Sequence, residues 1–328
     1  MPQKSIPYAV ARTRVLEGKL LTQEQMRRLL DAPDASTVLR TLVEMGYGLG
    51  QESGDYRKMI AAELAQAYGY VREVTPNPYA TGAFMLKGDC HNCKVFCKAK
   101  LLGRTPELSD GGTVPAQLLL DALQSQRYSV LPLHLEQAMR TEDAKIESGT
   151  ANVQHMEFVL DAACYADMAD YAQKSRQKTV VRCIQAQADL LNLTTLLRVR
   201  KNGQGIEVLT QALVPGGTVE HKTFLDALHA TDDALIQQLH MQAYREVVQA
   251  GVEAFLKTGS LGVLERLSDD FITALLRACR YERDSITPLV GYLVAKEREA
   301  QAIRVIMVAK INNVPMEMAQ ERLRDLYA

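Results

Sequence analysis

One pattern of polar and apolar residues occurs three times in this chain, at 89–100, 189–200 and 299–310. The copies align without a gap: an acid comes first, apolar residues follow seven and eight positions later, and a base stands eleven positions after the acid. Eleven helical residues turn through about 1,100°, so the acid and the base lie on one face of a helix, about three turns apart. Such a helix, polar at its ends and apolar between, suits packing against other protein. The acids are Asp89, Asp189 and Glu299, and the bases are Lys100, Arg200 and Lys310.

Asparagines accompany the pattern in two of its three copies. Asn92 and Asn192 each follow the acid by three positions, whereas Ala302 stands at that place in the last copy. A buried amide has to be hydrogen bonded. We therefore interpret Asn92 and Asn192 as internal hydrogen-bonding groups.

A second repeated element follows the first two copies. Gly-Gly-Thr-Val occurs at 111–114 and again at 216–219, and each leads into an apolar run that contains Leu-Asp-Ala-Leu. Near the start of the chain, Leu-Leu-Thr at 20–22 and Leu-Leu-Asp-Ala at 29–32 resemble the same element. A threonine hydroxyl can accept a hydrogen bond from a free N–H of the first helical turn, so each threonine is predicted to be a helix N-cap. These residues are Thr22, Thr113 and Thr218, and Gln25 completes a capping box with the first.

The repeats predict three similar helical units. Their spacing of about one hundred residues exceeds that of short solenoid repeats, so each unit should contain several helices. The expected units are 1–84, 85–185 and 186–328, and only the closing half of the repeated helix is recognisable near the N-terminus. We therefore predict that the C-terminal segment completes the first unit, and that the chain ends meet and close a ring or a tightly curved shell.

Composition favours an all-α, well-packed soluble protein. Hydrophobic residues make up 47% of the chain and charged residues 23%, there is no tryptophan, and strong helix formers are frequent. The stretch 152–200 is predicted to be nearly continuous helix, bent near Ser175. Thr287 followed by Pro288 predicts an N-cap with proline at the first helical position.

Charge and hydropathy argue against two classes of partner. With 38 basic and 39 acidic side chains the net charge is −1, so the chain lacks the positive field that binds nucleic acid. No apolar run reaches the roughly 18 residues of a membrane-spanning helix, and the N-terminus lacks an apolar signal core. We expect a cytosolic protein that reaches a membrane only through a partner.

Six cysteines raise the question of a metal site. Cys90, Cys93 and Cys97 share one face of a predicted helix, and three thiolates could bind a soft metal. The next copy of the repeat has leucines at the equivalent positions, and a reduced buried cysteine packs as a small hydrophobe. Core packing is the better account, so no metal or other cofactor is predicted.

Glycines and histidines give no clear sign of chemistry. Glycines at 46, 48, 50 and 54 resemble a phosphate-binding loop, but they follow a helical pattern instead of a strand, so a helix C-cap and turn is the better interpretation. The six histidines are dispersed and show no metal-ligand spacing. No catalytic residues are predicted.

Taken in order, several short motifs resemble one protein family. They are Tyr-x-x-Ala-Arg-x-Arg at 8–14, Asp-x-x-Asn-x-Lys at 89–94, Asp-x-x-Asn-x5-Arg at 189–198 and the segment 291–310. Their order, their spacing and the internal repeat resemble the C subunits of bacterial and archaeal V-type (A-type) ATPases, which are equivalent to the eukaryotic d subunit. The resemblance covers the whole chain, and it departs from the family at Ala302 and in the cysteine-rich first copy.

The resemblance implies a mechanical role and no enzymatic activity of the chain itself. Members of this family are all-helical funnels of three subdomains around a pseudo-threefold axis. They sit on the cytoplasmic face of the proteolipid rotor ring and hold the foot of the central axle. The implied partners are the axle subunits and the proteolipid ring, and the implied function is to couple ATP hydrolysis or synthesis to ion transport without a bound cofactor. A general curved helical scaffold is the alternative.

The charged residues of the repeat and of the matching motifs are the candidates for gripping these partners. A second interpretation is that these acids and bases pair between neighbouring units and hold the shell together. Reversing the charge of several bases together would distinguish the two interpretations. Loss of binding to the axle subunits with normal helical content would indicate a partner contact. The candidates are Arg12, Arg14, Asp89, Lys100, Asp189, Arg200, Glu297, Glu299, Arg304 and Lys310.

Overall fold

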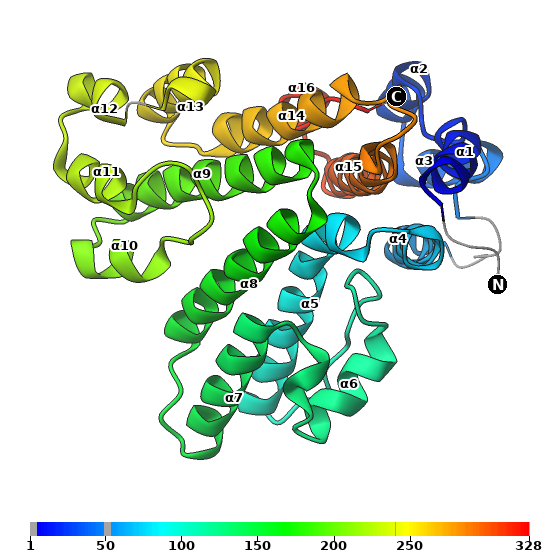
Figure 1. The fold of residues 1–328 in the computed structure, drawn as a ribbon. Coiled ribbons are helices and arrows are strands. Elements are labelled where there is room, and N and C mark those ends of the chain that lie inside the picture. Colours follow the sequence, from blue (N-terminus) through cyan, green and yellow to red (C-terminus); the bar gives the residue numbers. More distant parts are fainter. Residues whose placement is uncertain (1–4, 49–53, 240, 328) are drawn as a thin grey trace. The chain divides into compact units, whose positions relative to one another are not determined.

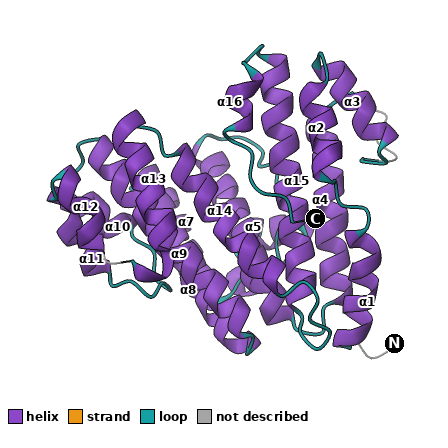
Figure 2. Cartoon of the chain, turned by 90° about the horizontal axis from the view of Figure 1, so that it is seen from above, coloured by secondary structure: helices purple, strands orange, loops and turns teal. Residues whose placement is uncertain are grey.

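The computed structural model describes residues 5–48, 54–239 and 241–327. All regular secondary structure in these ranges is helical, and Figure 1 shows the helices in chain order. The cartoon in Figure 2 accordingly contains no strand among the described residues. The predicted all-α fold class is therefore confirmed. No helix in the described ranges is long and apolar enough to cross a membrane.

The chain forms two compact units, and each is described by itself. The first unit combines Met1–Asn77 with Asp269–Ala328, and the second is Pro78–Ser268. The first unit thus contains the first and the last segments of the described chain. The division into 1–84, 85–185 and 186–328, the pseudo-threefold axis and the closed ring stay predictions.

The first unit is built around the long helix α15. Apolar side chains of α15, among them Ile303, Ile306 and Met307, form one core with Leu29 and Leu42 of the N-terminal helices. Figure 2 shows α4 and α15 side by side, and the two helices are in direct contact. The helices of this unit are α1 (Ile6–Glu17), α2 (Gln23–Asp31), α3 (Ala35–Glu44), α4 (Tyr56–Val74), α15 (Thr287–Ile311), α16 (Met316–Gln320) and the later part of α14 (Gly262–Ala278).

The second unit is organised around α5, α8 and α9. Helix α8 contacts α5, α7 and α9, and a chain of short helices follows α9 (Figure 1). Its α-helices are α5 (Pro78–Leu101), α6 (Ala116–Gln124), α7 (Leu133–Glu147), α8 (Val153–Ser175), α9 (Lys178–Lys201), α10 (Ile206–Ala212), α11 (His221–Asp226), α12 (Asp232–Leu239) and α13 (Arg245–Thr258). In the described part of this unit, 3₁₀ turns lie between some of these helices: η1 (Tyr128–Val130), η2 (Ala227–His229) and η3 (Gln242–Tyr244).

The predicted near-continuous helix over 152–200 is present as α8 and α9 with a break at the expected place. Helix α8 ends at Ser175, and Arg176 adopts the left-handed conformation with φ 57°. The Ser175 hydroxyl donates to the carbonyl of Ala172 at 2.6 Å and accepts from the N–H of Gln177 at 3.1 Å. This local bonding competes with the helical hydrogen bonds, which explains why the helix stops here.

Two predicted helix starts can be compared with the structure. Thr22 caps α2, and Gln25 completes the capping box with hydrogen bonds of 2.9 and 3.2 Å, so this prediction is confirmed. Helix α15 begins at Thr287 itself, so Thr287 is the first helical residue and not the N-cap. The Ser285 hydroxyl accepts the Thr287 N–H at 3.1 Å and thereby takes the capping contact.

Candidate functional site: the repeated carboxylates and their loops

The carboxylate that opens the first copy of the repeat binds the loop that follows its helix. Asp89, on α5, is completely buried. One of its oxygens accepts hydrogen bonds from the N–H and the hydroxyl of Thr113, at 2.8 and 2.6 Å, and the other accepts the Val114 N–H at 3.3 Å. These bonds satisfy a charge that would otherwise be costly to bury.

The second copy repeats this arrangement on α9. Asp189 is also completely buried and accepts from the N–H and the hydroxyl of Thr218 and from the N–H of Val219, at 2.7 to 3.0 Å. The Tyr244 hydroxyl adds a further hydrogen bond at 2.9 Å. Burial, together with the nearby Asp189 carboxylate, raises the pKa of Tyr244, which therefore stays a proton donor.

These contacts correct the prediction that Thr113 and Thr218 are helix N-caps. Helix α6 begins only at Ala116 and α11 only at His221. Both threonine hydroxyls donate to the buried aspartates instead. Each hydroxyl lies beside a carboxylate from a different helix. A hydrogen bond to a charged carboxylate is stronger than the hydrogen bond between neutral groups that an N-cap would make.

The glycines of the Gly-Gly-Thr-Val element are explained by the same geometry. A Cβ atom on Gly112 would lie 2.0 Å from an oxygen of Asp89, and one on Gly217 would lie 2.0 Å from an oxygen of Asp189. A side chain at either position would therefore displace the loop from its carboxylate. The repeated sequence element is a cradle for the repeated acid.

In the third copy, the buried carboxylate that binds a loop belongs to a glutamate, which is longer than an aspartate. Glu299, on α15, is 2% exposed and accepts a hydrogen bond from the N–H of Leu21. When Leu-Leu-Thr at 20–22 is aligned with Gly-Gly-Thr at 111–113, Leu21 stands at the position of Gly112. The extra methylene of glutamate extends the carboxylate further from its helix, so the loop can carry a side chain here.

Glu299 belongs to a buried cluster of charges. The ammonium of Lys296 lies 3.0 Å from Glu299 and 3.2 Å from Glu63, and only 8% of the Lys296 side chain is exposed. Burial raises the pKa of Glu299 above its ordinary value, and the nearby Lys296 only partly opposes this. Burial lowers the pKa of Lys296, but the two carboxylates outweigh it and the net shift is upward. The cluster holds the loop after α1 against α15.

The three bases at the other end of the stripe also bind inside their units. Lys100 contacts Asp143 at 2.6 Å and Glu147 at 3.0 Å. Arg200 donates to the carbonyls of Ala227, Leu228 and Ala230 at 3.2, 2.8 and 2.8 Å and pairs with Asp232 at 3.1 Å. Lys310 donates to the carbonyl of Leu30 at 2.8 Å. Each base thus fixes a neighbouring helix end or turn.

The two asparagines of the repeat make matching pairs of hydrogen bonds. Asn92 donates to the Ser109 carbonyl at 2.8 Å and accepts its N–H at 2.9 Å. Asn192 makes the same two bonds to Val214, at 2.9 and 2.8 Å. Each side-chain amide therefore bonds both the backbone N–H and the backbone carbonyl of one loop residue. It provides the hydrogen bonds that a neighbouring backbone segment would otherwise provide.

The remaining sequence candidates lie at different depths. Arg12 pairs with Glu73 at 3.1 Å, and its side chain is 41% exposed. Arg14 pairs with Glu17 at 2.5 Å, and Glu297 accepts from the Tyr68 hydroxyl. Arg304 is exposed on α15. The structure therefore uses most of the candidates for internal bonds, and their partner-binding roles stay predictions.

The cysteine-rich helix packs as a core. Cys90, Cys93 and Cys97 are buried, and Cys90 donates to the carbonyl of Leu160 at 3.4 Å. Burial raises the pKa of Cys93, and it raises the pKa of Cys97 to about 12, so both thiols remain protonated near neutral pH. The three side chains are therefore part of the interior of the second unit.

The glycines after α3 form a helix end. Helix α3 stops at Glu44, and Gly46 and Gly48 have φ 80° and 70°. The N–H of Gly46 bonds the carbonyl of Val43, and that of Tyr47 bonds the carbonyl of Leu42, both at 2.9 Å. This is the left-handed C-cap that the glycines predicted. Gly50 lies outside the described residues.

One group of titratable side chains comes together only in the folded chain. His134, Asp167 and Asp170 have ligand atoms within 4.8 Å of one another, although histidine spacing alone gives no signal. Asp167 accepts the N–H groups of His134 and Leu135 at 3.1 and 2.8 Å. The carboxylate therefore caps the start of α7, which accounts for its burial.

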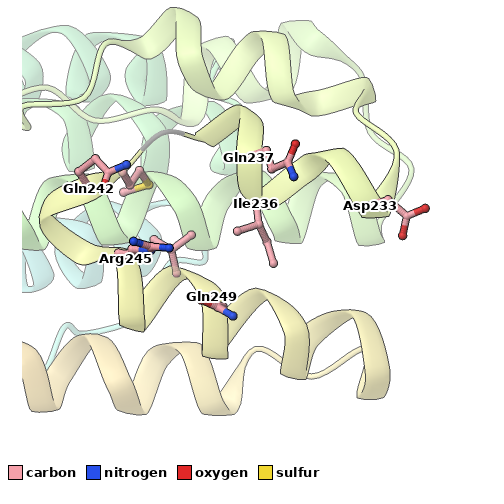
Figure 3. A pocket seen from close by; sticks show the side chains of 8 residues that line it. Asp233, Ile236, Gln237, Gln242, Arg245 and Gln249 are labelled. Atoms are coloured by element: carbon pink, nitrogen blue, oxygen red, sulfur yellow. The ribbon is translucent and has the colours of Figure 1, made fainter.

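An open groove in the second unit lies between α12, η3 and α13 (Figure 3). It has a volume of about 630 Å³ and a mixed lining that includes Asp233, Ile236, Gln237, Arg245 and Gln249. The carboxylate of Asp233 and the guanidinium of Arg245 give this surface both signs of charge.

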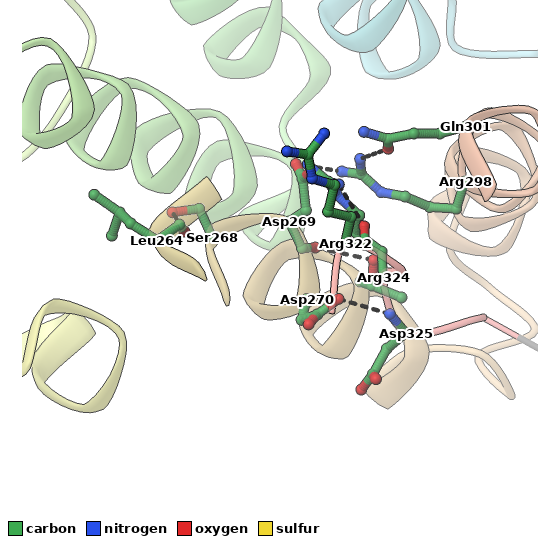
Figure 4. A network of polar contacts seen from close by, with 10 residues as sticks. Leu264, Ser268, Asp269, Asp270, Arg298, Gln301, Arg322, Arg324 and Asp325 are labelled. Atoms are coloured by element: carbon green, nitrogen blue, oxygen red, sulfur yellow. Dashed lines mark hydrogen bonds and ion pairs between the residues drawn. The ribbon is translucent and has the colours of Figure 1, made fainter. Parts of the chain in front are cut away.

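A network of ion pairs anchors the last described residues in the first unit. Asp269 of α14 contacts Arg298 of α15 at 2.8 Å and Arg324 at 3.0 Å, as Figure 4 shows. Asp270 accepts the N–H of Asp325 at 2.7 Å. One carboxylate shared by two arginines from different segments fixes the final turn against two helices.

Comparison with known proteins connects this architecture to a family. The chain is 22% identical to the C subunit of the V-type sodium ATPase of Enterococcus hirae, over 93% of each chain. It is 26% identical to the C subunit of the A-type ATP synthase of Desulfurococcus sp., over 97% of this chain and 91% of the relative. For the same protein of Methanocaldococcus jannaschii the identity is 22%, over 98% and 87%. The model of the family ATP synthase (C/AC39) subunit matches residues 9–322, and the chain therefore belongs to this family.

Proposed function

We propose that this chain is the socket that joins the central axle of a V/A-type rotary ATPase to its proteolipid ring. As a member of the ATP synthase (C/AC39) family, the chain is a non-catalytic stalk component of such a complex. The match over residues 9–322 is the observation that carries the proposal. The proposed location is the cytoplasmic face of the membrane, where the chain is held by the membrane sector of the ATPase.

The contacts inside each unit suit a part that transmits torque. Buried aspartates fix loops to α5 and α9, and the Lys296 cluster and the Asp269 network do the same around α15. Because these bonds are buried or half-buried and are shared among several segments, the loops cannot shift independently of the helices. A stiff body loses less of an applied rotation to internal deformation.

Deletion of the chain in its own cells tests the proposal. Membranes from the deletion strain should lose ATP-driven ion transport, while the catalytic head should still hydrolyse ATP, because coupling is removed and the catalytic site is not. Tagged chain reintroduced from a plasmid should restore transport and co-purify with axle subunits and the proteolipid. Normal transport without the chain, or purification free of ATPase subunits, would instead favour the alternative of a general helical scaffold.

A further inference from the structure

An apolar groove lies between the end of α15 and α16, within the first unit. Helix α15 ends in a left-handed turn at Asn313, with φ 53°, and the N–H of Val314 bonds the carbonyl of Ala309 at 2.9 Å. Helix α16 starts directly afterwards, at Met316, and contacts α15. The tight turn folds α16 back and leaves a groove of about 370 Å³ between the two helices.

The floor of this groove is unusually apolar for a surface. It is formed by Val305, Val308, Val314 and Met318. Val308 is 47% exposed and Met318 is 54% exposed, so large apolar groups face the solvent together. Contiguous exposed apolar surface with a polar rim is typical of a site that binds another protein.

The rim is positively charged. Arg304 and Arg322 line the groove and are exposed, and among the described residues neither guanidinium has a hydrogen-bond or ion-pair partner. Their neighbours differ: Arg298 and Arg324 share the carboxylate of Asp269 (Figure 4). No carboxylate is among the described residues that line the groove. Two guanidinium groups without a partner in the described chain, beside an apolar floor, are complementary to a ligand that has both apolar and acidic side chains.

We propose that this groove binds an amphipathic helical segment of another protein of the complex, whose apolar side chains enter the floor and whose carboxylates pair with Arg304 and Arg322. A helix that packs an apolar face into a hydrophobic groove is a common mode of recognition. Arginine binds carboxylates in a bidentate manner, so the rim sets the charge and the register of the segment. The groove's role in the cell rests on the proposed function, whereas its ability to bind such a helix does not.

Binding of two peptide probes to the purified full chain tests the charge preference. One labelled helical peptide has leucines spaced i, i+4 and i+7 flanked by glutamates, and the other has lysines in place of the glutamates. Fluorescence anisotropy at low salt should show the acidic peptide binding about tenfold more tightly or better, and added salt should reduce the difference. Equal affinity for both peptides, or no binding of the acidic one, would overturn the proposal.

Variants locate the binding on the surface. Arg304→Glu combined with Arg322→Glu should reverse the peptide preference, and Val308→Asp should abolish binding of the acidic peptide. The matched control is Arg27→Glu with Arg28→Glu, because both residues are exposed on α2 and make no part of the groove. Circular dichroism checks that each variant keeps its helices. If the α2 variant changes peptide binding as much as the groove variant does, the proposed site is wrong.

A crosslink in the assembled ATPase identifies the natural occupant. A photoreactive residue at position 308, in chain that co-purifies with the complex, should capture a segment of another protein of the complex that contains both apolar and acidic residues. Capture of a second copy of this chain, of lipid, or of nothing would contradict the proposal, while the co-purification itself leaves the proposed function intact.

Discussion

At the scale of single residues, the buried acids decide which neighbours are tolerated. Gly112 must stay small, because a Cβ atom there would lie 2.0 Å from an oxygen of Asp89. We expect Gly112→Ala to lower the free energy of unfolding by about 1–3 kcal/mol, as overpacking does in cores. Urea denaturation followed by circular dichroism measures this loss.

The control for this substitution is Gly69→Ala, in the middle of α4. A Cβ atom at Gly69 would have no neighbour within 4 Å, so alanine should raise the free energy of unfolding by about 0.5–1 kcal/mol through helix propensity. Equal effects of the two substitutions would show that contact with Asp89 is not the reason for the glycine.

Glu299 predicts a characteristic pH dependence. Its pKa in the folded protein is raised above the ordinary value of 4.5, so the folded state binds its proton more tightly than the unfolded state does. The contribution of Glu299 to stability is therefore fully present below about pH 4.5 and is lost as the pH rises through the folded pKa. Glu299→Gln removes this titration. The free energy of unfolding of the variant, relative to that of the natural protein, should therefore increase as the pH rises towards neutrality.

Free energies of unfolding for both proteins, taken from urea titrations at several pH values, measure the difference. Glutamine resembles the protonated glutamic acid in volume and keeps an acceptor for the Leu21 N–H. The ion pair with Lys296 forms only when Glu299 is ionised, so its effect is already contained in the net upward shift of the Glu299 pKa. Parallel pH curves for the two proteins would refute the assignment of a raised pKa to Glu299.

At the scale of elements, Arg200 ties the end of α9 to the turn η2. One nitrogen of its guanidinium bonds three carbonyl oxygens, and the other pairs with Asp232. Lysine has a single nitrogen and cannot reproduce this fork, so Arg200→Lys should lower the free energy of unfolding by about 1–3 kcal/mol.

Arg198 provides a matched comparison on the same helix. Its contact with Glu265 is exposed and 3.4 Å long, and Arg198→Lys should change stability by about 0–1 kcal/mol. Chemical denaturation of both variants compares their losses in the free energy of unfolding. A loss for Arg200→Lys no larger than that for Arg198→Lys would mean that the carbonyl contacts of Arg200 are not what holds η2.

At the scale of the whole molecule, the first unit depends on segments far apart in the sequence. The core around Leu29 and Leu42 is completed by Ile303, Ile306 and Met307 of α15. A fragment of residues 1–77 should therefore be largely unfolded, whereas the same fragment joined by a flexible linker to 269–328 should be helical and unfold cooperatively. Circular dichroism with urea denaturation tests both fragments, and a cooperatively folded 1–77 alone would contradict this view of the core.

The sequence was sufficient to predict the helical class, the three acid-to-base helices and the break near Ser175, because helix periodicity and capping are local properties. It also marked Asp89 and Asp189 as special, since their spacing recurs. The hydrogen-bond partners of these two acids became known only from the folded chain. Thr113 is predicted from the sequence to cap a helix, yet it bonds a carboxylate 24 positions away, and Arg200 bonds carbonyls instead of an acid of the repeat. Hydrogen bonds act over about 3 Å, so their partners depend on which distant backbone the packing brings near.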